Sequence, residues 1–213
     1  MGYTPERRTG MLVCPYDLRP DTFVLLTEDQ AGLPVATATL VFDGPEGLPC
    51  MDTFGAEVRG LRAPGRLFTE VARLAISPRH QHAPELLLRL INYLFIYGAH
   101  CGGATDALIE VNPRHAAFYE RLLGFRRLGA GRDCPRVCGA PAVLLHLERQ
   151  VYVSALGRAM AALAGGGSSR LRSLYRQFVP PAQEARLAGV LASQQRALSG
   201  QDLAALRQYT ACE

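Results

Sequence analysis

Residues 112–125 read Asn-Pro-Arg-His-Ala-Ala-Phe-Tyr-Glu-Arg-Leu-Leu-Gly-Phe, and this stretch decides the fold. It predicts a helix, because Asn112 can act as the N-cap, a proline suits the first turn and Gly124 marks the end. Helical spacing places four side chains on one inward face: His115, Phe118, Tyr119 and Leu122. A tyrosine and a histidine among apolar residues indicate a helix that carries chemistry. The alternative is an ordinary packed helix whose tyrosine hydroxyl has a buried partner.

Strand and helix signals surround this helix. Apolar and β-branched runs predict strands at residues 23–27, 35–42, 67–76, 106–111 and 142–148. The first two read as a hairpin, and an apolar segment that begins at Pro84 predicts a helix to Gly98. The order of strands, helix, strand, helix and strand predicts an α+β (α/β) fold in which helices pack on a sheet.

Composition divides the chain into three parts. Residues 1–22 are polar with three prolines and predict an N-terminal arm, and residues 23–150 hold the predicted sheet. In residues 151–213 alanine and leucine dominate, which predicts a helical C-terminal extension with helices near 152–164, 170–178, 182–197 and 200–209. This extension could cover the sheet or contact a partner, including a second copy in a homo-oligomer.

The overall composition excludes several classes of protein. The chain has 213 residues, 48% of them hydrophobic and 20% charged, which is typical of a globular protein. No apolar run reaches the roughly 18 to 20 residues of a transmembrane segment, and the start lacks a signal peptide, so we expect a cytoplasmic protein. The net charge of +4 comes from arginines spread along the chain. This pattern disfavours nucleic acid and favours an acidic protein partner.

The six cysteines give no sign of a metal site. They are scattered, and the one close pair, Cys134 and Cys138, has a spacing that matches no standard zinc pattern. No cysteine has a local signature that pairs it with a base. We therefore expect free, reduced thiols and no bound metal.

The residues quoted so far resemble a known superfamily. A strand, an asparagine cap, a tyrosine and Gly-Phe in series resemble the closing half of the GNAT acyltransferase fold. Five segments that span most of residues 23–147 are similar to the long-chain N-acyl amino acid synthases, a GNAT branch related to the autoinducer synthases: residues 44–49, 61–66, 70–76, 110–115 and 139–145. The resemblance implies a mixed, mostly antiparallel twisted sheet with flanking helices.

The resemblance also implies a reaction. A fatty acyl group would pass from a thioester to the α-amino group of an amino acid by direct attack, with no bound cofactor. Two other readings stay open. One is an acyl-homoserine-lactone-like synthase or an acyl-CoA-dependent N-acetyltransferase, and the other is a non-catalytic module that binds a carrier protein.

The loop at residues 77–84 bears on the acyl donor. Acetyl-CoA users of the superfamily present backbone N–H groups of a glycine-containing loop to a pyrophosphate. Here the loop reads Ser-Pro-Arg-His-Gln-His-Ala-Pro, with no glycine and two prolines that lack an N–H. A single phosphodiester on the phosphopantetheine of an acyl carrier protein needs fewer donors, so we expect that donor rather than acyl-CoA. The expected donor-binding residues are Ile76, Arg79, His80 and His82; the alternative is a solvated turn.

Acyl transfer from a thioester to an amine needs a base for the amine and an acid for the leaving thiolate. Glu70 is the expected base, because it lies in an apolar strand where burial raises the pKa of a carboxyl group. An ion pair with a structural arginine is the alternative. Tyr119 is the expected acid. His115, one turn earlier, is expected to relay a proton or contact the pantetheine, unless it is structural.

Three further residues are expected to bind the acceptor amino acid. Arg73 suits its carboxylate, but it is three residues from Glu70, so a shared site requires a bulge in the strand. Asp52 could bind the amino group, and an exposed loop acid is the alternative. Asn112 is expected chiefly to cap its helix, with any ligand contact secondary.

Overall fold

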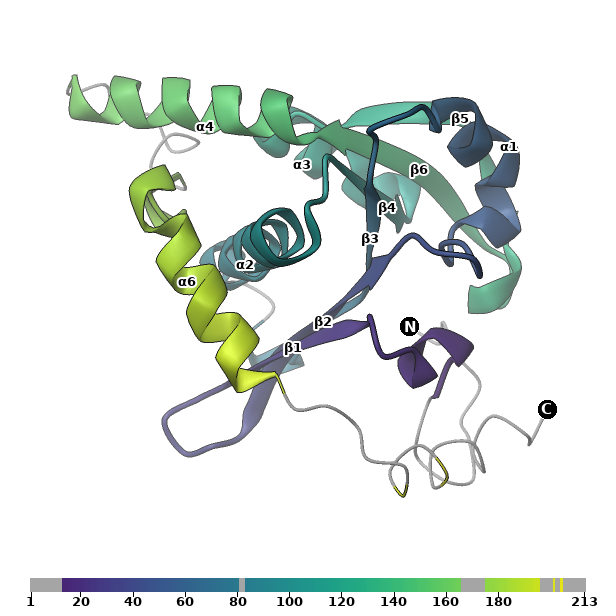
Figure 1. Cartoon of the computed structure of the whole chain (residues 1–213), viewed down its shortest axis with the longest axis horizontal. Coiled ribbons are helices and arrows are strands. Elements are labelled where there is room, and N and C mark those ends of the chain that lie inside the picture. The colour runs from purple at the N-terminus through teal and green to yellow at the C-terminus, as the bar shows by residue number, and fades with distance from the viewer. Residues whose placement is uncertain (1–12, 81–82, 166–174, 196–200, 202–203, 205–213) are drawn as a thin grey trace.

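A single mixed sheet forms the centre of the computed structural model, which describes residues 13–80, 83–165, 175–195, 201 and 204 (Figure 1). The strand order is β1-β2-β3-β4-β6-β5. Only β3 and β4 pair in parallel, so the sheet is mostly antiparallel, as predicted. The six strands are β1 (Phe23–Glu28), β2 (Pro34–Phe42), β3 (Phe68–Ile76), β4 (Asp106–Val111), β5 (Arg126–Cys134) and β6 (Ala140–Glu148).

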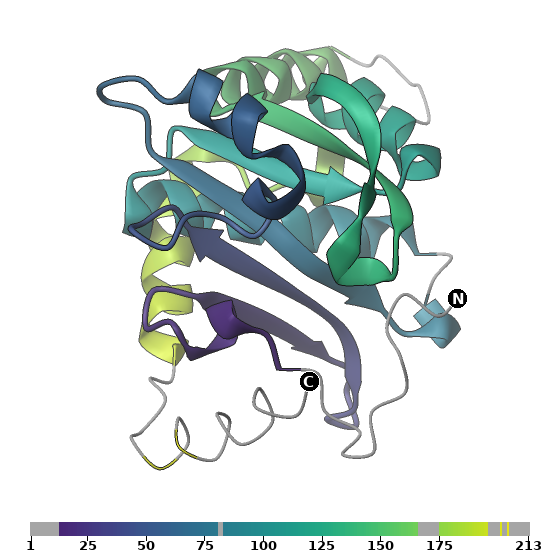
Figure 2. The ribbon, with the colours of Figure 1, turned by 90° about the vertical axis from the view of Figure 1, so that its right-hand side faces the viewer.

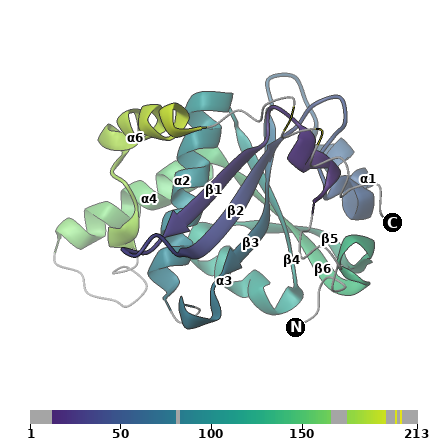
Figure 3. The same ribbon diagram turned by 90° about the horizontal axis from the view of Figure 1, so that it is seen from below.

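Helices cover both faces of the sheet (Figures 1 and 3). One face carries α1 (Met51–Leu61), and its core includes Phe54, Phe68 and Leu108. The other face has the larger core and carries α2 (Pro84–Gly102), α3 (Pro113–Leu123), α4 (Arg149–Ala164) and α6 (Pro181–Gln194). Short 3-10 turns are η1 (Pro15–Leu18), η2 (Pro78–His80), η3 (Pro135–Val137) and η4 (Tyr175–Gln177). Within the described residues, none of the helices is long and apolar enough to cross a membrane.

Two elements were not predicted, and the C-terminal helices differ in part from the prediction. Helix α1 and strand β5 occupy segments without a clear apolar period. Helix α4 begins three residues before the predicted helix at 152–164, and α6 corresponds to the one predicted at 182–197. Of the helix predicted at 170–178, residues 170–174 lie outside the described residues, and residues 175–177 form the η4 turn. The helix predicted at 200–209 lies outside them too, apart from Gln201 and Ala204.

The parallel pair β3 and β4 separates part way along its length. Hydrogen-bonded pairing joins only residues 68–71 of β3 to residues 106–109 of β4. Beyond this point β3 continues beside β2 to Ile76, and β4 continues beside β6 to Val111. Figure 2 shows the two strands pointing apart. The sheet therefore opens next to Glu70 and Leu108.

A bulge interrupts β3 immediately after this opening. Thr39 of β2 pairs with Ala72, whereas Thr37 pairs with Ala75, so β3 carries one extra residue in this interval. Arg73 lies within the bulge and has a φ of 50°, in the left-handed region that a residue other than glycine seldom adopts. Such a bulge changes which face of a sheet the following side chains occupy. The bulge that a shared Glu70 and Arg73 site requires is therefore present.

One buried asparagine ties the C-terminal helices to the rest of the fold. Asn92 of α2 is 0% exposed and donates to the Tyr152 hydroxyl of α4 at 2.7 Å. Its carbonyl oxygen accepts from the Val179 backbone N–H at 2.9 Å. Asn92, a polar residue within the apolar helix α2, thus binds both α4 and the segment just before α6.

Replacing Asn92 with alanine is expected to lower the free energy of unfolding by about 2 kcal/mol, because the buried Tyr152 hydroxyl and the half-buried Val179 N–H each lose a hydrogen bond. Urea unfolding followed by circular dichroism measures the change. Arg89→Ala is the matched control, since Arg89 lies on the same helix and contacts the same extension through an exposed bond to Gln177. An Asn92 variant no less stable than the control would contradict this role.

Candidate active site

Glu70 lies at the point where β3 and β4 separate, on the face covered by α1. It is 2% exposed, and its Oε2 accepts a hydrogen bond from the Cys50 backbone N–H at 2.7 Å. Cys50 is the residue that precedes α1 and belongs to the same core. The carboxyl group of Glu70 is thus buried, and Cys50 supplies its hydrogen bonds through the backbone N–H and the side chain.

Burial raises the pKa of Glu70 from its ordinary 4.5 to about 7. The Cys50 backbone N–H and the Arg136 charge act in the opposite direction, and the Glu110 carboxylate adds to the rise. A carboxyl group with a pKa near 7 can accept a proton from a reacting amine under neutral conditions. This is the property expected of the base.

A set of polar side chains surrounds Glu70 on the same face. Glu110 of β4 accepts a hydrogen bond from the Thr53 hydroxyl at 3.3 Å and pairs with the guanidinium of Arg136 in η3. The Glu110 side chain is 6% exposed. The same charges act on Cys50, whose thiol pKa is raised mainly by burial and further by Glu70. We define the active-site cluster as Glu70, Cys50, Thr53, Glu110 and Arg136.

The raised pKa of Glu70 implies a measurable effect of pH on stability. The folded protein keeps the proton up to a pH near 7, whereas the unfolded chain releases it near 4.5. Stability is therefore lost as pH rises between these values. Between pH 5 and pH 8 the wild type should lose about 2 to 3 kcal/mol relative to Glu70→Gln, measured by urea unfolding. Glu120→Gln, which changes a partly exposed carboxylate, should lose as much stability between pH 5 and pH 8 as the wild type does.

Arg73 lies in the β3 bulge, three residues after Glu70, and is engaged by another carboxylate. Its guanidinium forms an ion pair with Asp17 of η1, and a third of its side chain is exposed (33%). Burial lowers the pKa of Arg73, but the charge of Asp17 raises it, and the net shift is upward. The expected anchor for the acceptor carboxylate thus already holds one carboxylate.

Tyr119 lies on the opposite face of the sheet from Glu70. It projects from α3 into the larger core, is 6% exposed and packs edge-to-face against Phe118 and Phe125. Burial raises the pKa of its phenol to about 12. For Tyr119 to act as the acid, a thioester would have to pass through the opening between β3 and β4 and lie between the two side chains. Tyr119 therefore stays a prediction as the acid.

The structure corrects the placement of His115. Helix α3 turns Ala116, Tyr119 and Leu122 toward the sheet, and His115 is exposed instead of lying on the inward face. Its ring accepts a hydrogen bond from the neighbouring Arg114 at 2.9 Å. Partial burial and the charge of Arg114 both lower its pKa. Ala116, one residue later, fills the inward position in the first turn.

Asn112 and Asp52 differ in their local roles. Asn112 caps α3, since its Oδ1 accepts from the Arg114 backbone N–H at 3.2 Å. Asp52 is exposed and lies in the first turn of α1, which begins at Met51, and not in the loop that the alternative interpretation assumed; its role at the acceptor stays a prediction. The neighbouring Thr53, rather than Asp52, contacts the active-site cluster.

The expected donor-binding residues follow the end of β3. Ile76 ends this strand opposite Ala36, and Arg79 and His80 lie in η2. Arg79 is exposed, whereas Nδ1 of His80 is buried with no hydrogen-bond partner among the described residues. His82 lies outside the described residues.

Sequence reasoning missed most of the active-site cluster. Glu110 carried the same signal as Glu70, a carboxylate within an apolar strand, but was read only as part of a family segment. Arg136 lies between Cys134 and Cys138, where only a zinc site was considered. Cys50 and Thr53 belong to the start of α1, which was not predicted. Within the part of the chain that the structure describes, no group of histidine, cysteine and acidic side chains could hold a metal ion.

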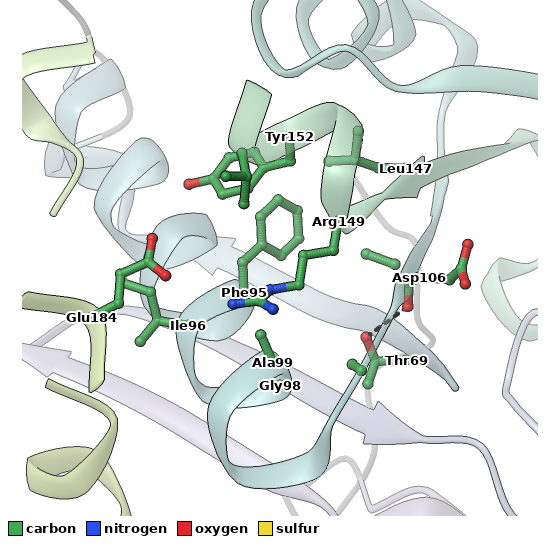
Figure 4. A pocket seen from close by; sticks show the side chains of 13 residues that line it. Thr69, Phe95, Ile96, Gly98, Ala99, Asp106, Leu147, Arg149, Tyr152 and Glu184 are labelled. Atoms are coloured by element: carbon green, nitrogen blue, oxygen red, sulfur yellow. Dashed lines mark hydrogen bonds between the residues drawn. The ribbon is translucent and has the colours of Figure 1, made fainter. Parts of the chain in front are cut away.

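A separate cavity lies at the amino ends of β3 and β4, on the face of the larger core (Figure 4). It is small, with a volume of about 30 Å³, and apolar side chains such as Phe95 and Leu147 line it. Arg149 of α4 and Glu184 of α6 also line it. A hydrogen bond of 3.1 Å joins Oε2 of Glu184 to Nε2 of His100. The opening beside Glu70 lies toward the carboxyl ends of the same strands, so the cavity and the active-site cluster are distinct.

Comparison with solved structures identifies the fold. The structure of FeeM, an N-acyl amino acid synthase from uncultured soil microbes, matches with a TM-score of 0.59 and 25% identity, over 65% of this chain and 79% of that chain. The CoA-dependent acyl-homoserine lactone synthase MesI matches with a TM-score of 0.51 and 17% identity, over 78% and 80% of the two chains. The CoA-dependent acyl-homoserine lactone synthase BjaI, solved with SAM and isopentyl-CoA, matches with 0.50 and 17%, over 81% and 80%. The fold is GNAT-like, as the resemblance implied.

No curated protein sequence matches the chain. A protein-family model does match it and agrees with the structural comparison. The family model described as N-acyl amino acid synthase FeeM matches residues 1–148, which include all strands, α1 to α3 and every member of the active-site cluster. The protein is therefore an acyltransferase, and the chain belongs to the N-acyl amino acid synthase FeeM family.

Proposed function

We propose that the protein transfers a long-chain fatty acyl group from an acyl carrier protein thioester to the α-amino group of an amino acid. The observation that carries the proposal is the buried Glu70 carboxyl group at the opening between β3 and β4. Its pKa of about 7 suits a base that deprotonates an amine. FeeM, which is described as an N-acyl amino acid synthase, supports this choice of product.

The proposed reaction is a direct attack. The acceptor nitrogen attacks the thioester carbonyl, Glu70 takes a proton from that nitrogen, and the carbon–sulfur bond breaks as the amide forms. The Tyr119 phenol supplies a proton to the leaving thiolate from the other side of the opening. Only a thioester on a slender arm could reach between two strands in this way, which suits phosphopantetheine.

The choice of an acyl carrier protein over acyl-CoA rests on the loop before α2. Residues 77–84 contain no glycine, and Pro78 and Pro84 have no N–H to offer to a pyrophosphate. Helix α2 begins at Pro84 without a side-chain cap, so its first turn and the nearby Arg79 can bind a single phosphate. We propose that Ile76, Arg79, His80 and His82 contact the donor arm.

The purified full chain should be incubated with hexadecanoyl carrier protein, or with hexadecanoyl-CoA at the same concentration, and a mixture of the twenty amino acids. Mass spectrometry should detect N-hexadecanoyl amino acids, formed at least about tenfold faster from the carrier protein. Acetyl-CoA is the control for a short-chain enzyme. Faster product formation from hexadecanoyl-CoA would overturn the choice of donor, and no amide from any donor would overturn the proposed function.

A further inference from the structure

Arg136 has an unusual position in the active-site cluster. Its Nη2 group pairs with Glu110 and lies 3.9 Å from the Cys134 sulfur. Its Nε atom is buried but has no hydrogen-bond acceptor among the described residues. Folded proteins seldom leave a buried N–H group unpaired, and each such group needs an explanation.

An acceptor supplied by a bound ligand would explain this N–H group. A guanidinium has five N–H donors and no acceptor, and a carboxylate matches its planar geometry best. Glu110 occupies one side of Arg136 and leaves Nε available. The side chain as a whole is 28% exposed but Nε itself is buried, so a ligand that enters from solvent reaches Nε only when a neighbouring group moves aside.

The position of Arg136 relative to Glu70 sets the orientation of such a ligand. The two side chains lie on the same face of the sheet, and the charge of each affects the other. In an α-amino acid one carbon atom separates the amino group from the carboxylate carbon. The inference requires that a carboxylate bound by Arg136 leave the amino group facing Glu70. Arg73 is less suited, since the charges that act on it are those near Asp17 in η1, whereas Glu70 acts on Arg136.

We propose that Arg136 binds the α-carboxylate of the acceptor through its buried Nε–H group, and so selects free α-amino acids over their amides, their esters and simple amines. This inference rests on the proposed function and assigns its acceptor site. Glu110 acts as a positioning residue that holds the guanidinium, and Arg136 is the residue that touches the substrate.

The test compares the twenty amino acids with the corresponding amino acid amides as acceptors for hexadecanoyl carrier protein. The wild type should prefer the acids, measured as kcat/KM for the best acceptor and its amide. Arg136→Gln should lower kcat/KM for the acid about 10- to 100-fold more than kcat/KM for the amide, because the effect of Arg136 on Glu70 is common to both acceptors. Arg127→Gln, at an exposed arginine that pairs with Glu120, is the matched control and should keep the preference.

A conservative variant separates substrate binding from folding. Arg136→Lys keeps a cation beside Glu110 but lacks the Nε–H group, so it should fold like the wild type and still lose most of the preference for the acid. A folded Arg136→Gln protein with an unchanged ratio of acid to amide would overturn the inference. Loss of the preference in Arg73→Gln instead would move the anchor to Arg73 and overturn it as well.

Binding measured without turnover distinguishes the inference from the proposed function. In thermal unfolding, millimolar amino acids should stabilise the wild type more than their amides, and Arg136→Gln should abolish this difference. Stabilisation of this kind without any amide product would overturn the proposed function and leave the acceptor site standing. Equal turnover of acids and amides by the wild type would overturn the site alone, and neither stabilisation nor product would overturn both.

Discussion

Replacing Glu70 with glutamine is expected to lower kcat by about 10² to 10⁴-fold and to leave KM nearly unchanged. Glutamine preserves the shape of the side chain and can accept the hydrogen bond from the Cys50 backbone N–H. It cannot accept a proton from the amine. Single-turnover assays with acylated carrier protein measure the chemical step directly. Glu120→Gln, a change at a partly exposed carboxylate of α3, is the control and should keep full activity.

The pH profile identifies the reason for the loss. The base works only when Glu70 is ionised, so the wild-type rate should rise with pH through a step near its pKa of about 7. That step should be absent from the residual rate of Glu70→Gln. If the step near pH 7 persists in the variant, another group is the base.

Tyr119→Phe is expected to lower kcat by about 10²-fold with little change in KM. Burial raises the pKa of the phenol to about 12, so the hydroxyl stays protonated throughout the neutral range and can supply a proton to the thiolate. Phenylalanine keeps the ring contacts with Phe118 and Phe125, so stability should change little. Tyr93→Phe, at a partly buried tyrosine that packs against the same core, is the matched control.

The leaving group distinguishes an acid from a residue that only packs. An aryl thioester releases a more stable thiolate than pantetheine does and needs less help from a proton donor. With an S-phenyl thioester of the same fatty acid, the defect of Tyr119→Phe should shrink toward the wild-type rate. A defect of equal size with both donors would show that the hydroxyl does not protonate sulfur.

The sequence predicted the elements whose residues alternate or repeat clearly. Helix α3 was bounded correctly by Asn112 and Gly124, because caps leave a local signature. Helix α1 was missed because it contains two glycines and has non-helical dihedral angles at Phe54, so its helical signal is weak. Strand β5 was missed because it is an exposed edge strand rich in arginine and glycine, with only Cys134 buried.

The candidate site was predicted only in part for a related reason. Glu70 stood out because a carboxylate within an apolar strand has to be explained. Arg136 comes from a short turn, and only the return of β5 beside β6 brings it to Glu110. Contacts of this kind join residues far apart in the chain and leave no local pattern. His115 was misplaced because helical spacing alone does not say which first-turn residue faces the sheet.

The hydrogen bonds of Asn92 have a consequence for how the chain can be shortened. The family match ends at residue 148, yet Asn92 binds Tyr152 and the Val179 backbone N–H beyond it. Leu156, Phe178 and Leu191 continue the larger core across that limit. A chain cut after Glu148 would expose apolar surface of α2 to water and leave the Asn92 side-chain amide without these hydrogen-bond partners. Proteolytic trimming to the family-matched portion should therefore yield aggregates rather than a minimal enzyme.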